Sequence, residues 1–436
     1  MDFGGDFGVD LQSRLLEPLD ALHGPRDPAA FRLCLVVPQS GALGMIGPSA
    51  LDAALLAAHE VNAGGGIEGS GSEGWGRTVA GAAGAARPGP VRSAERRLEL
   101  VLVDGGRAPR AVAAEVAGLV GAGVVEAVAG FHASDVHRAV EPVVSGRVPY
   151  VFTPPHEGGG RLPGVVCTGV DPGPQLAGSL AWLTRCHRVR RWALVGNDYI
   201  WPRAVHGAAR RAIGRTHAEV VLESWVPLGG VGPALQRLVE GLRRHRVDAV
   251  LVSLIGRDLV RFNRGLRHSG LDRRLIRLSG ALEENGLLAL GGDDTGGLYS
   301  CMDSFASLTE DRALALTERH RALFGPSAPV LDAYARGLYD GVHLVAALAA
   351  RGSLLPDDRL PLTVRRLLHG TDAAARRAWR SAPLGPSHPR MHLARAEGAE
   401  LRVVQSFPFP FRSPARDAPA PAPDASSLAP NTSIWK

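Results

Sequence analysis

Short apolar runs alternate with amphipathic helical segments along most of the chain, and this alternation limits the possible folds more than any other feature. The run FRLCLVV at residues 31–37 is followed by the turn-prone PQSGALG and then by helical spacing of apolar residues over 51–61. Strands that are apolar on both faces and alternate with helices indicate parallel sheets covered on both sides, a doubly wound α/β fold. Further strands are expected at 98–103, 124–129, 150–152, 192–195, 220–225, 249–254 and 275–278, each but that at 150–152 followed by a helical segment.

These units are more than one open sheet comfortably holds, so the sequence predicts two lobes. The segment TPPHEGGGRLPG at 153–164, rich in proline and glycine, marks the break between them. Helices are expected at 311–324 and 331–351, and a late β-hairpin at 390–405. We therefore expect lobe I to comprise residues 31–152 and 305–385, and lobe II to comprise 153–304 and 386–412.

Three segments are expected to stand outside this fold. Residues 1–30 form an N-terminal extension of unassigned role. Residues 64–94 are dominated by glycine and alanine, and 414–436 by proline, alanine, serine and aspartate. Neither composition buries enough apolar surface to offset the entropy of ordering, so the first is expected to be a loop insertion and the second a disordered tail.

Composition excludes several classes of function. The only lysine is Lys436, which argues against a P-loop nucleotide hydrolase and against Schiff-base chemistry. The four cysteines are scattered without a C-x-x-C pair, which argues against a zinc site and a disulfide framework. No metal or other cofactor is expected. The net charge of +6 is spread along the sequence rather than gathered in one run, so direct nucleic-acid binding is not expected.

The chain shows no signal for membrane insertion or export. No stretch approaches the roughly 20 apolar residues that cross a bilayer. The first thirty residues are acidic and lack the basic start and apolar run of a secretory signal. We therefore expect a cytoplasmic protein, with export as the alternative if the true start codon lies upstream.

Two sequence motifs match known binding patterns but lack the structural context that those patterns require. GSGSEG at 69–74 matches G-x-G-x-x-G but lies in the low-complexity segment rather than between a strand and a helix. The pairs His132/His137 and His388/His392 have metal-ligand spacing, yet no carboxylate or cysteine cluster completes a ligand set.

Three loops that follow expected strands carry polar and aromatic side chains. Ser134 lies near the start of a helix, where free N–H groups can bind a carbonyl or carboxylate oxygen; a plain helix-capping serine is an equal interpretation. Phe152 and Pro154 follow a second strand, and Tyr199 and Trp201 follow a third. Because ligands of open α/β sheets bind at the carboxyl ends of strands, the three loops together favour a cleft.

Several segments resemble the type I periplasmic binding proteins, and within them the branch of amide and urea binders that includes cytoplasmic amide sensors. The most specific segment is GNDYIWPR at 196–203. The others are AVEPVV at 139–144, PPHEG at 154–158, the helix at 332–339 and PLGP at 383–386. The resemblance implies a Venus-flytrap architecture in which the chain crosses three times between lobes and ligand closes the hinge.

The same resemblance implies the site residues. Ser134 would donate to a ligand carbonyl, Tyr199 and Trp201 would wall the pocket, and Phe152 would pack against it from the first lobe. His132 and Pro154 occupy pocket positions where the amide sensors have other residues. Glu284, or its neighbour Glu283, lies near the carboxylate with which amino-acid binders hold an ammonium group. The expected ligand is an amide, urea or an amino-acid-like molecule, with a neutral amide favoured.

Three functions compete on this basis. The first is a ligand sensor that signals through hinge closure to a regulatory partner such as an antiterminator, with a homodimer as the candidate assembly. The second is the substrate-binding component of an ABC importer. The third, an amidohydrolase using His132, Ser134 and Asp135, is disfavoured because neighbours on one loop seldom converge as nucleophile, base and acid, and no G-x-S-x-G motif is present.

Overall fold

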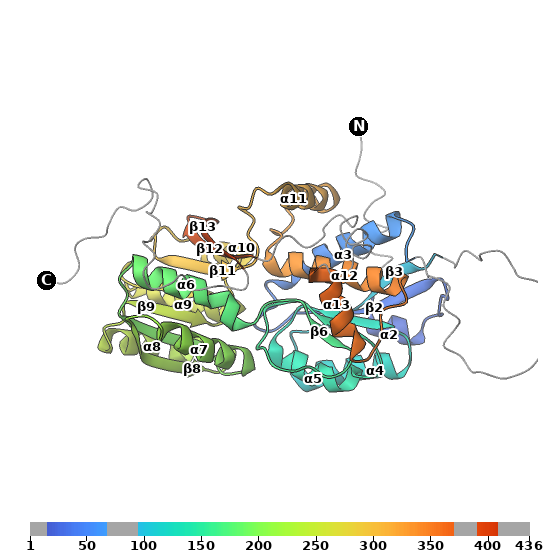
Figure 1. Ribbon diagram of the computed structural model, residues 1–436, viewed down its shortest axis with the longest axis horizontal. Helices are drawn as coiled ribbons and strands as arrows, with labels where there is room; N and C mark the ends of the chain where they lie inside the picture. Colours follow the sequence, from blue (N-terminus) through green and yellow to red (C-terminus); the bar gives the residue numbers. More distant parts are fainter. Residues whose placement is uncertain (1–14, 68–94, 370–389, 409–436) are drawn as a thin grey trace, which may run out of the picture.

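The computed structural model describes residues 15–67, 95–369 and 390–408. They form two α/β lobes that lie side by side, each built around its own sheet (Figure 1). The expected loop insertion, apart from residues 64–67, and the expected tail lie outside the described residues, as does the PLGP segment. The two-lobe, parallel-sheet α/β fold predicted from the sequence is confirmed.

The first lobe contains a six-stranded parallel sheet in the order β1-β3-β2-β4-β5-β6. Its strands are β1 (Leu15–Leu16), β2 (Ala30–Val37), β3 (Arg97–Asp104), β4 (Ala127–Gly130), β5 (Tyr150–Phe152) and β6 (Val165–Cys167). The helices of this lobe are α2 (Pro18–His23), α3 (Gly47–Ala63), α4 (Pro109–Gly121), α5 (Ser134–Val144), α11 (Asp311–Phe324), α12 (Ala333–Ala350) and α13 (Arg359–His369).

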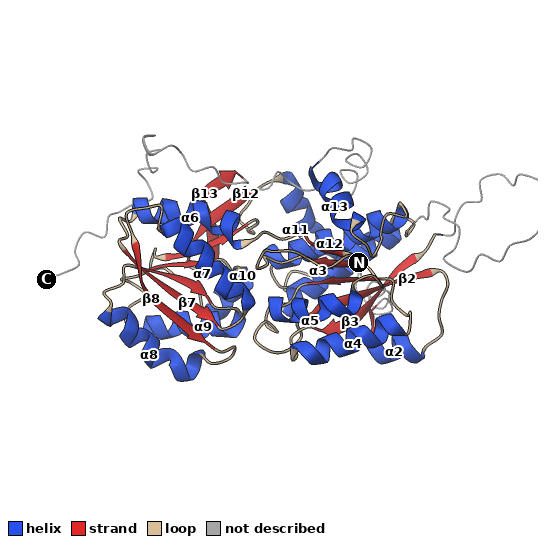
Figure 2. Cartoon of the chain, turned by 60° about the horizontal axis from the view of Figure 1, so that its bottom comes forward, coloured by secondary structure: helices blue, strands red, loops and turns tan. Residues whose placement is uncertain are grey.

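The second lobe contains a seven-stranded sheet in the order β13-β12-β11-β10-β9-β7-β8. Helices lie on both sides of its strands (Figure 2). The strands β7 (Arg191–Asn197), β8 (Glu219–Val226), β9 (Ala249–Ser253), β10 (Ile276–Ser279) and β11 (Leu298–Met302) are parallel. The predicted late hairpin is present as antiparallel β12 (Arg390–Glu397) and β13 (Glu400–Pro408). The helices are α6 (Pro172–Cys186), α7 (Ile200–Ile213), α8 (Val231–Arg244), α9 (Gly256–His268) and α10 (Glu284–Leu290).

Strand β2 shows why an apolar run on both faces forms this fold. Leu33 and Leu35 pack into the core beneath α3 and α12, whereas Cys34 and Val36 pack into the separate core beneath α4 and α5. Side chains of a strand alternate between the two faces, so a strand covered by helices on both sides must be apolar at every position.

The lobe boundaries differ from the predicted ones in two places. Strand β6 pairs in parallel with β5, so residues up to Cys167 belong to the first sheet, and the break predicted at residue 153 is wrong. Residues 15–30 are not outside the fold, because β1 pairs with β3 and Ala21 of α2 is fully buried. Both errors have the same cause: these edge strands are too short to carry a periodicity of their own, and only their pairing with a neighbouring strand defines them.

Other features concern the described residues as a whole. Cys34, Cys167, Cys186 and Cys301 are all free thiols. In the part of the chain that the structure describes, no cluster of side chains could hold a metal ion. No helix within the same ranges is both long and apolar enough to span a bilayer.

Candidate functional site

The carboxyl ends of the parallel strands in each lobe face the other lobe, and the loops that follow them meet there. The second lobe contributes Tyr199, which lies between β7 and α7 and is partly buried. Burial, reinforced by the charge of Asp135 and then by Tyr334 and Glu157, raises the pKa of its phenol well above the usual value. These neighbours belong to the first lobe, so Tyr199 lies at the junction of the two lobes, as predicted.

The lobes also touch directly through their backbones. The N–H of Arg257, at the start of α9, donates to the carbonyl oxygen of Ala42 in the loop after β2, at 3.0 Å. Gly256 has φ +48°, and a Cβ placed there would lie 1.9 Å from the Ala42 oxygen. Only glycine permits so close an approach in this backbone conformation.

The loop that carries Ala42 is held in place by one carboxylate. Asp104 Oδ1 accepts from the N–H groups of Gln39, Ser40 and Gly106 at 2.8, 3.2 and 2.8 Å, and Oδ2 accepts from Ser40 Oγ at 2.6 Å. Burial acts in the opposite direction, but these hydrogen bonds lower the pKa of Asp104, so it stays ionised. The contact surface of the first lobe is therefore rigid.

A second set of hydrogen bonds joins α10 to the segment that leads into α12. Asn285 Nδ2 donates to Val330 O at 2.9 Å and to Asp332 Oδ2 at 2.8 Å, and Asn285 Oδ1 accepts from Val330 N–H at 3.1 Å. Asp332 caps α12, which packs on the first sheet. One asparagine of the second lobe is thus bonded to the other lobe three times.

A hollow of about 420 Å³ lies between the lobes beside these contacts. Its first-lobe wall consists of the loops at 41–43 and 105–109 and the start of α5, including Asp135. Its second-lobe wall contains Leu228, Gly229, Ile255, Arg257, Asp258 and Arg261. The hollow therefore offers apolar surface, backbone polar groups and charges of both signs, which suits a small polar organic molecule.

Ser134 is the first residue of α5 and lies at the expected place, although Ala133 occupies the capping position. Its side chain is 3% exposed, and its Oγ has no hydrogen-bond partner among the described residues. Asp135 accepts only from the N–H of Val136, at 2.9 Å, and burial raises its pKa. Both side chains remain available to a bound molecule.

The structure places His132 and Phe152, two of the predicted ligand contacts, in the interior of the first lobe, and their roles in binding stay predictions. His132 Nε2 bonds to the hydroxyl of Tyr150 at 2.9 Å, and burial lowers its pKa to about 4. Phe152 is fully buried and stacks on His137, with ring centroids 4.1 Å apart. Phe152 belongs to the core beneath α5, and His132, two residues after β4, packs against it with ring centroids 5.0 Å apart.

The remaining predicted residues are placed but not shown to contact a ligand. Trp201 is 4% exposed in the core of the second lobe, and its indole N–H has no partner among the described residues. Pro154 is buried in the loop after β5. Glu284 is 5% exposed, and its Oε1 accepts from the N–H of Ala306 at 2.6 Å, which fastens α10 to the chain that leaves the second lobe. Their roles in binding stay predictions.

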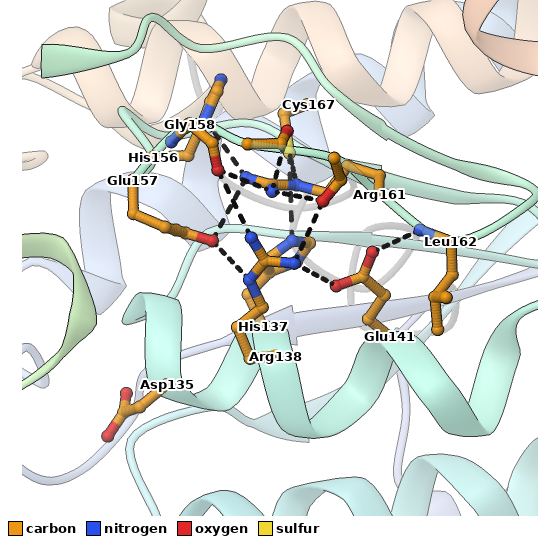
Figure 3. Close-up of polar contacts among 12 residues, drawn as sticks. Asp135, His137, Arg138, Glu141, His156, Glu157, Gly158, Arg161, Leu162 and Cys167 are labelled. Atoms are coloured by element: carbon orange, nitrogen blue, oxygen red, sulfur yellow. Dashed lines mark hydrogen bonds and ion pairs between the residues drawn. The ribbon is translucent and has the colours of Figure 1, made fainter. Parts of the chain in front are cut away.

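A buried ion-pair cluster, which the sequence reasoning missed, positions the start of α5 (Figure 3). Glu157 Oε1 lies 2.5 Å from Arg138 Nε and 3.2 Å from Arg161 Nη2, and Arg138 also donates to Glu141 at 2.9 Å. Asp135 points away from this cluster (Figure 3). PPHEG was noted only as a landmark, and nothing local in it signals that its glutamate pairs with arginines on a helix and a loop.

A family model described as a periplasmic binding protein matches residues 31–363. A solute-binding protein of an ABC transporter from R. palustris, solved with benzoate, is similar with a TM-score of 0.64 at 16% identity, over 86% of this chain and 96% of that one.

Two further solved structures have the same fold. The branched-chain amino acid transporter substrate-binding protein LivJ from Streptococcus pneumoniae, solved with isoleucine, has a TM-score of 0.64 at 16% identity, covering 86% of this chain and 99% of its own. A leucine-binding protein, LivK, from Thermotoga maritima has a TM-score of 0.65 at 14% identity, covering 87% and 99%.

Proposed function

The chain belongs to the periplasmic binding protein family, and we propose that it captures a small polar organic solute between its two lobes. The observation that carries the proposal is the meeting of polar groups from both lobes at one place. Asp135 of the first lobe lines the hollow of about 420 Å³, and its charge contributes to the raised pKa of Tyr199, which comes from the second lobe. Ser134, next in sequence to Asp135, has an unused hydroxyl.

The role that the similar structures favour is that of a substrate-binding component of an ABC importer. The neighbours from R. palustris and Streptococcus pneumoniae are described as ABC transporter or amino acid transporter binding proteins. Hinge closure around the solute would then present a loaded form to the membrane components. This role requires export, so fractionation of cells that express the full-length gene tests it; recovery only in the cytoplasm contradicts it.

The second role is the amide sensor that acts on an antiterminator-like partner. This role is supported by the resemblance of the segment GNDYIWPR at 196–203 to the amide and urea binders; its tyrosine lies at the lobe junction. The sensor role is also consistent with the expected cytoplasmic location. A ligand can bias such a partner only by binding the open and closed forms differently. This role is supported if the regulator encoded beside the gene co-purifies with the protein and dissociates from it when ligand is added. Size-exclusion chromatography of the purified protein shows whether it is a homodimer.

A thermal-shift screen tests the binding proposal itself. Short amides, urea, branched-chain amino acids and aromatic carboxylates are the probes, since a molecule bound only by the native state raises the unfolding midpoint. We expect one class to raise it, and Ser134→Ala and Tyr199→Ala to abolish the rise. Ser269→Ala, a serine at the far end of α9, is the matched control and keeps it. No shift with any class, or an unchanged shift in both cleft variants, contradicts the proposal.

A further inference from the structure

Two arginines of the second lobe adopt a backbone conformation that disfavours any side chain. Arg188, after α6, has φ +54°, and Arg246, after α8, has φ +44°. They are the only non-glycine residues with positive φ in the described part of the chain. After each arginine, the N–H of the next residue, a valine, donates to the carbonyl oxygen five residues before that valine, at 3.0 and 3.3 Å. This hydrogen bond terminates the helix.

The same helix ending occurs elsewhere in the molecule with glycine in the left-handed position. Gly123 follows α4, Gly270 follows α9 and Gly352 follows α12, all with positive φ and the same backward hydrogen bond. Glycine is the usual residue there because a Cβ is strained at positive φ. The turn itself therefore does not explain an arginine at either position.

Both strained arginines line one groove, hereafter the basic groove. It has a volume of about 1220 Å³ and lies at the amino ends of the strands of the second lobe, the edge opposite the junction with the first lobe. Its charged lining residues are the arginines Arg188, Arg243, Arg246, Arg273, Arg274 and Arg395 and the acids Asp248, Asp294 and Glu397.

The positive charge of the basic groove is largely uncompensated. Two of its acids are already engaged: Asp248 accepts from the N–H groups of Arg190 and Arg191, and Glu397 pairs with Arg395 and Arg402. Among the described residues, the side chains of four lining arginines make no ion pair or hydrogen bond: Arg188, Arg246, Arg273 and Arg274. Arg243 donates only to the backbone carbonyl oxygen of Ser269, at 2.8 Å.

The net charge of the protein is concentrated in this lobe. Residues 171–302 contain 19 arginines and 12 aspartates and glutamates, a net charge of +7, whereas the whole chain carries +6. The basic groove is therefore embedded in the positive half of the molecule, and an anion approaching it is attracted by the whole lobe.

Stabilisation of the helix ends does not account for these arginines. A cation near a helix C-terminus interacts favourably with the helix dipole, but it needs no positive φ to do so. The last turns of α6 and α8 already carry Arg185, Arg243 and Arg244. A further arginine in a strained position adds little to the dipole and leaves the strain unexplained.

We propose that the basic groove is a second ligand site, separate from the junction between the lobes, and that it binds a small anion bearing two or more phosphate groups. Guanidinium groups pair with phosphate oxygens through two parallel hydrogen bonds. Several phosphates are expected rather than one because four unpaired guanidinium groups line the groove, and their combined charge must also outweigh the negative ends of the helices there. The volume of the basic groove accommodates such a chain.

The test uses tripolyphosphate as the probe, with binding to the full-length protein measured by titration calorimetry at low and moderate salt. The double variant Arg188→Gly and Arg246→Gly removes both charges and also the backbone strain. We expect at least about tenfold weaker binding together with a rise of about 2–4 °C in the unfolding midpoint. The double variant Arg215→Ala and Arg237→Ala removes the same charge from exposed positions of this lobe outside the basic groove, and keeps tight binding.

Three results would overturn the proposal. The first is no binding of tripolyphosphate by the wild-type protein. The second is equal weakening in the control variant, which would show attraction to the lobe as a whole. The third is a lower unfolding midpoint in the glycine variant, which would make the two arginines structural. Parallel titrations with a short DNA duplex and an acidic peptide complete the design: tighter binding of either, lost in the glycine variant, replaces the small anion with that partner.

Discussion

Replacing Gly256 by alanine should open the junction between the lobes. The added Cβ would lie 1.9 Å from the carbonyl oxygen of Ala42, and ordinary contact begins at 3.4 Å, so one lobe must move by about 1.5 Å. The atom in the way is backbone, held by the loop that Asp104 fixes, and it cannot rotate aside. The relief must come from separation of the lobes.

The free-energy change caused by Gly256→Ala has two parts that can be measured separately. Alanine at positive φ loses about 1 kcal/mol relative to glycine anywhere in the chain. Loss of the hydrogen bond from Arg257 N–H to Ala42 O costs a further 0.5–1.5 kcal/mol, roughly, and this second cost falls only on the closed arrangement. About 1 kcal/mol changes the ratio of closed to open molecules about fivefold.

Gly270→Ala is the matched control. Gly270 terminates the same helix at φ +70° and has nothing within 4 Å of an added Cβ, so it carries the strain without the contact. Both variants should lose about 1 kcal/mol of unfolding free energy from the backbone strain. Gly256→Ala should lose roughly a further 0.5–1.5 kcal/mol with the hydrogen bond, and it alone should show a larger radius of gyration by X-ray scattering. Equal radii in the two variants would refute the reasoning.

Two further predictions concern buried carboxylates. Glu157→Gln breaks the ion pairs with Arg138 and Arg161 and should lower the unfolding free energy by about 3 kcal/mol, because the arginine charges are left without their buried partner. The control Glu219→Gln, which breaks an exposed ion pair, should cost under about 1 kcal/mol. Similar losses in the two variants would contradict the account. Burial raises the pKa of Glu284 to about 7, so its contribution of up to about 3 kcal/mol is present below pH 4.5 and is lost as pH rises through 7. Glu284→Gln should therefore flatten the pH dependence of unfolding between pH 5 and 7, and an unchanged slope would count against this.

Much of the fold could be predicted because its signals are local. A strand covered on both faces is apolar at every position, as in β2, and helices such as α7 and α8 show their own periodicity. The two-lobe arrangement followed from the number of such units. The edge strands β1 and β6 could not be found this way, because they have only two and three residues and are defined by pairing with a neighbouring strand.

The candidate site was predictable in position but not in side-chain direction. Tyr199 follows a strand and lies at the lobe junction, as the loop pattern indicated. His132 and Phe152 also flank strand ends, yet both point into the core. A change of one residue in register turns a side chain to the other face of a sheet, and the sequence contains no independent measure of that register at a strand end.

What the sequence by itself determined is the kind of molecule: an α/β protein of two lobes, with polar and aromatic loops at the carboxyl ends of its strands. Only the tertiary structure decided which side chains meet. Arg188 and Arg246 are far apart in sequence and look like ordinary surface charges, yet they share a strained backbone conformation and one groove. Periodicity reports the neighbours within one helix or strand, whereas charge density, cavities and close backbone approaches arise between elements, and their physical cause is the packing of those elements against one another.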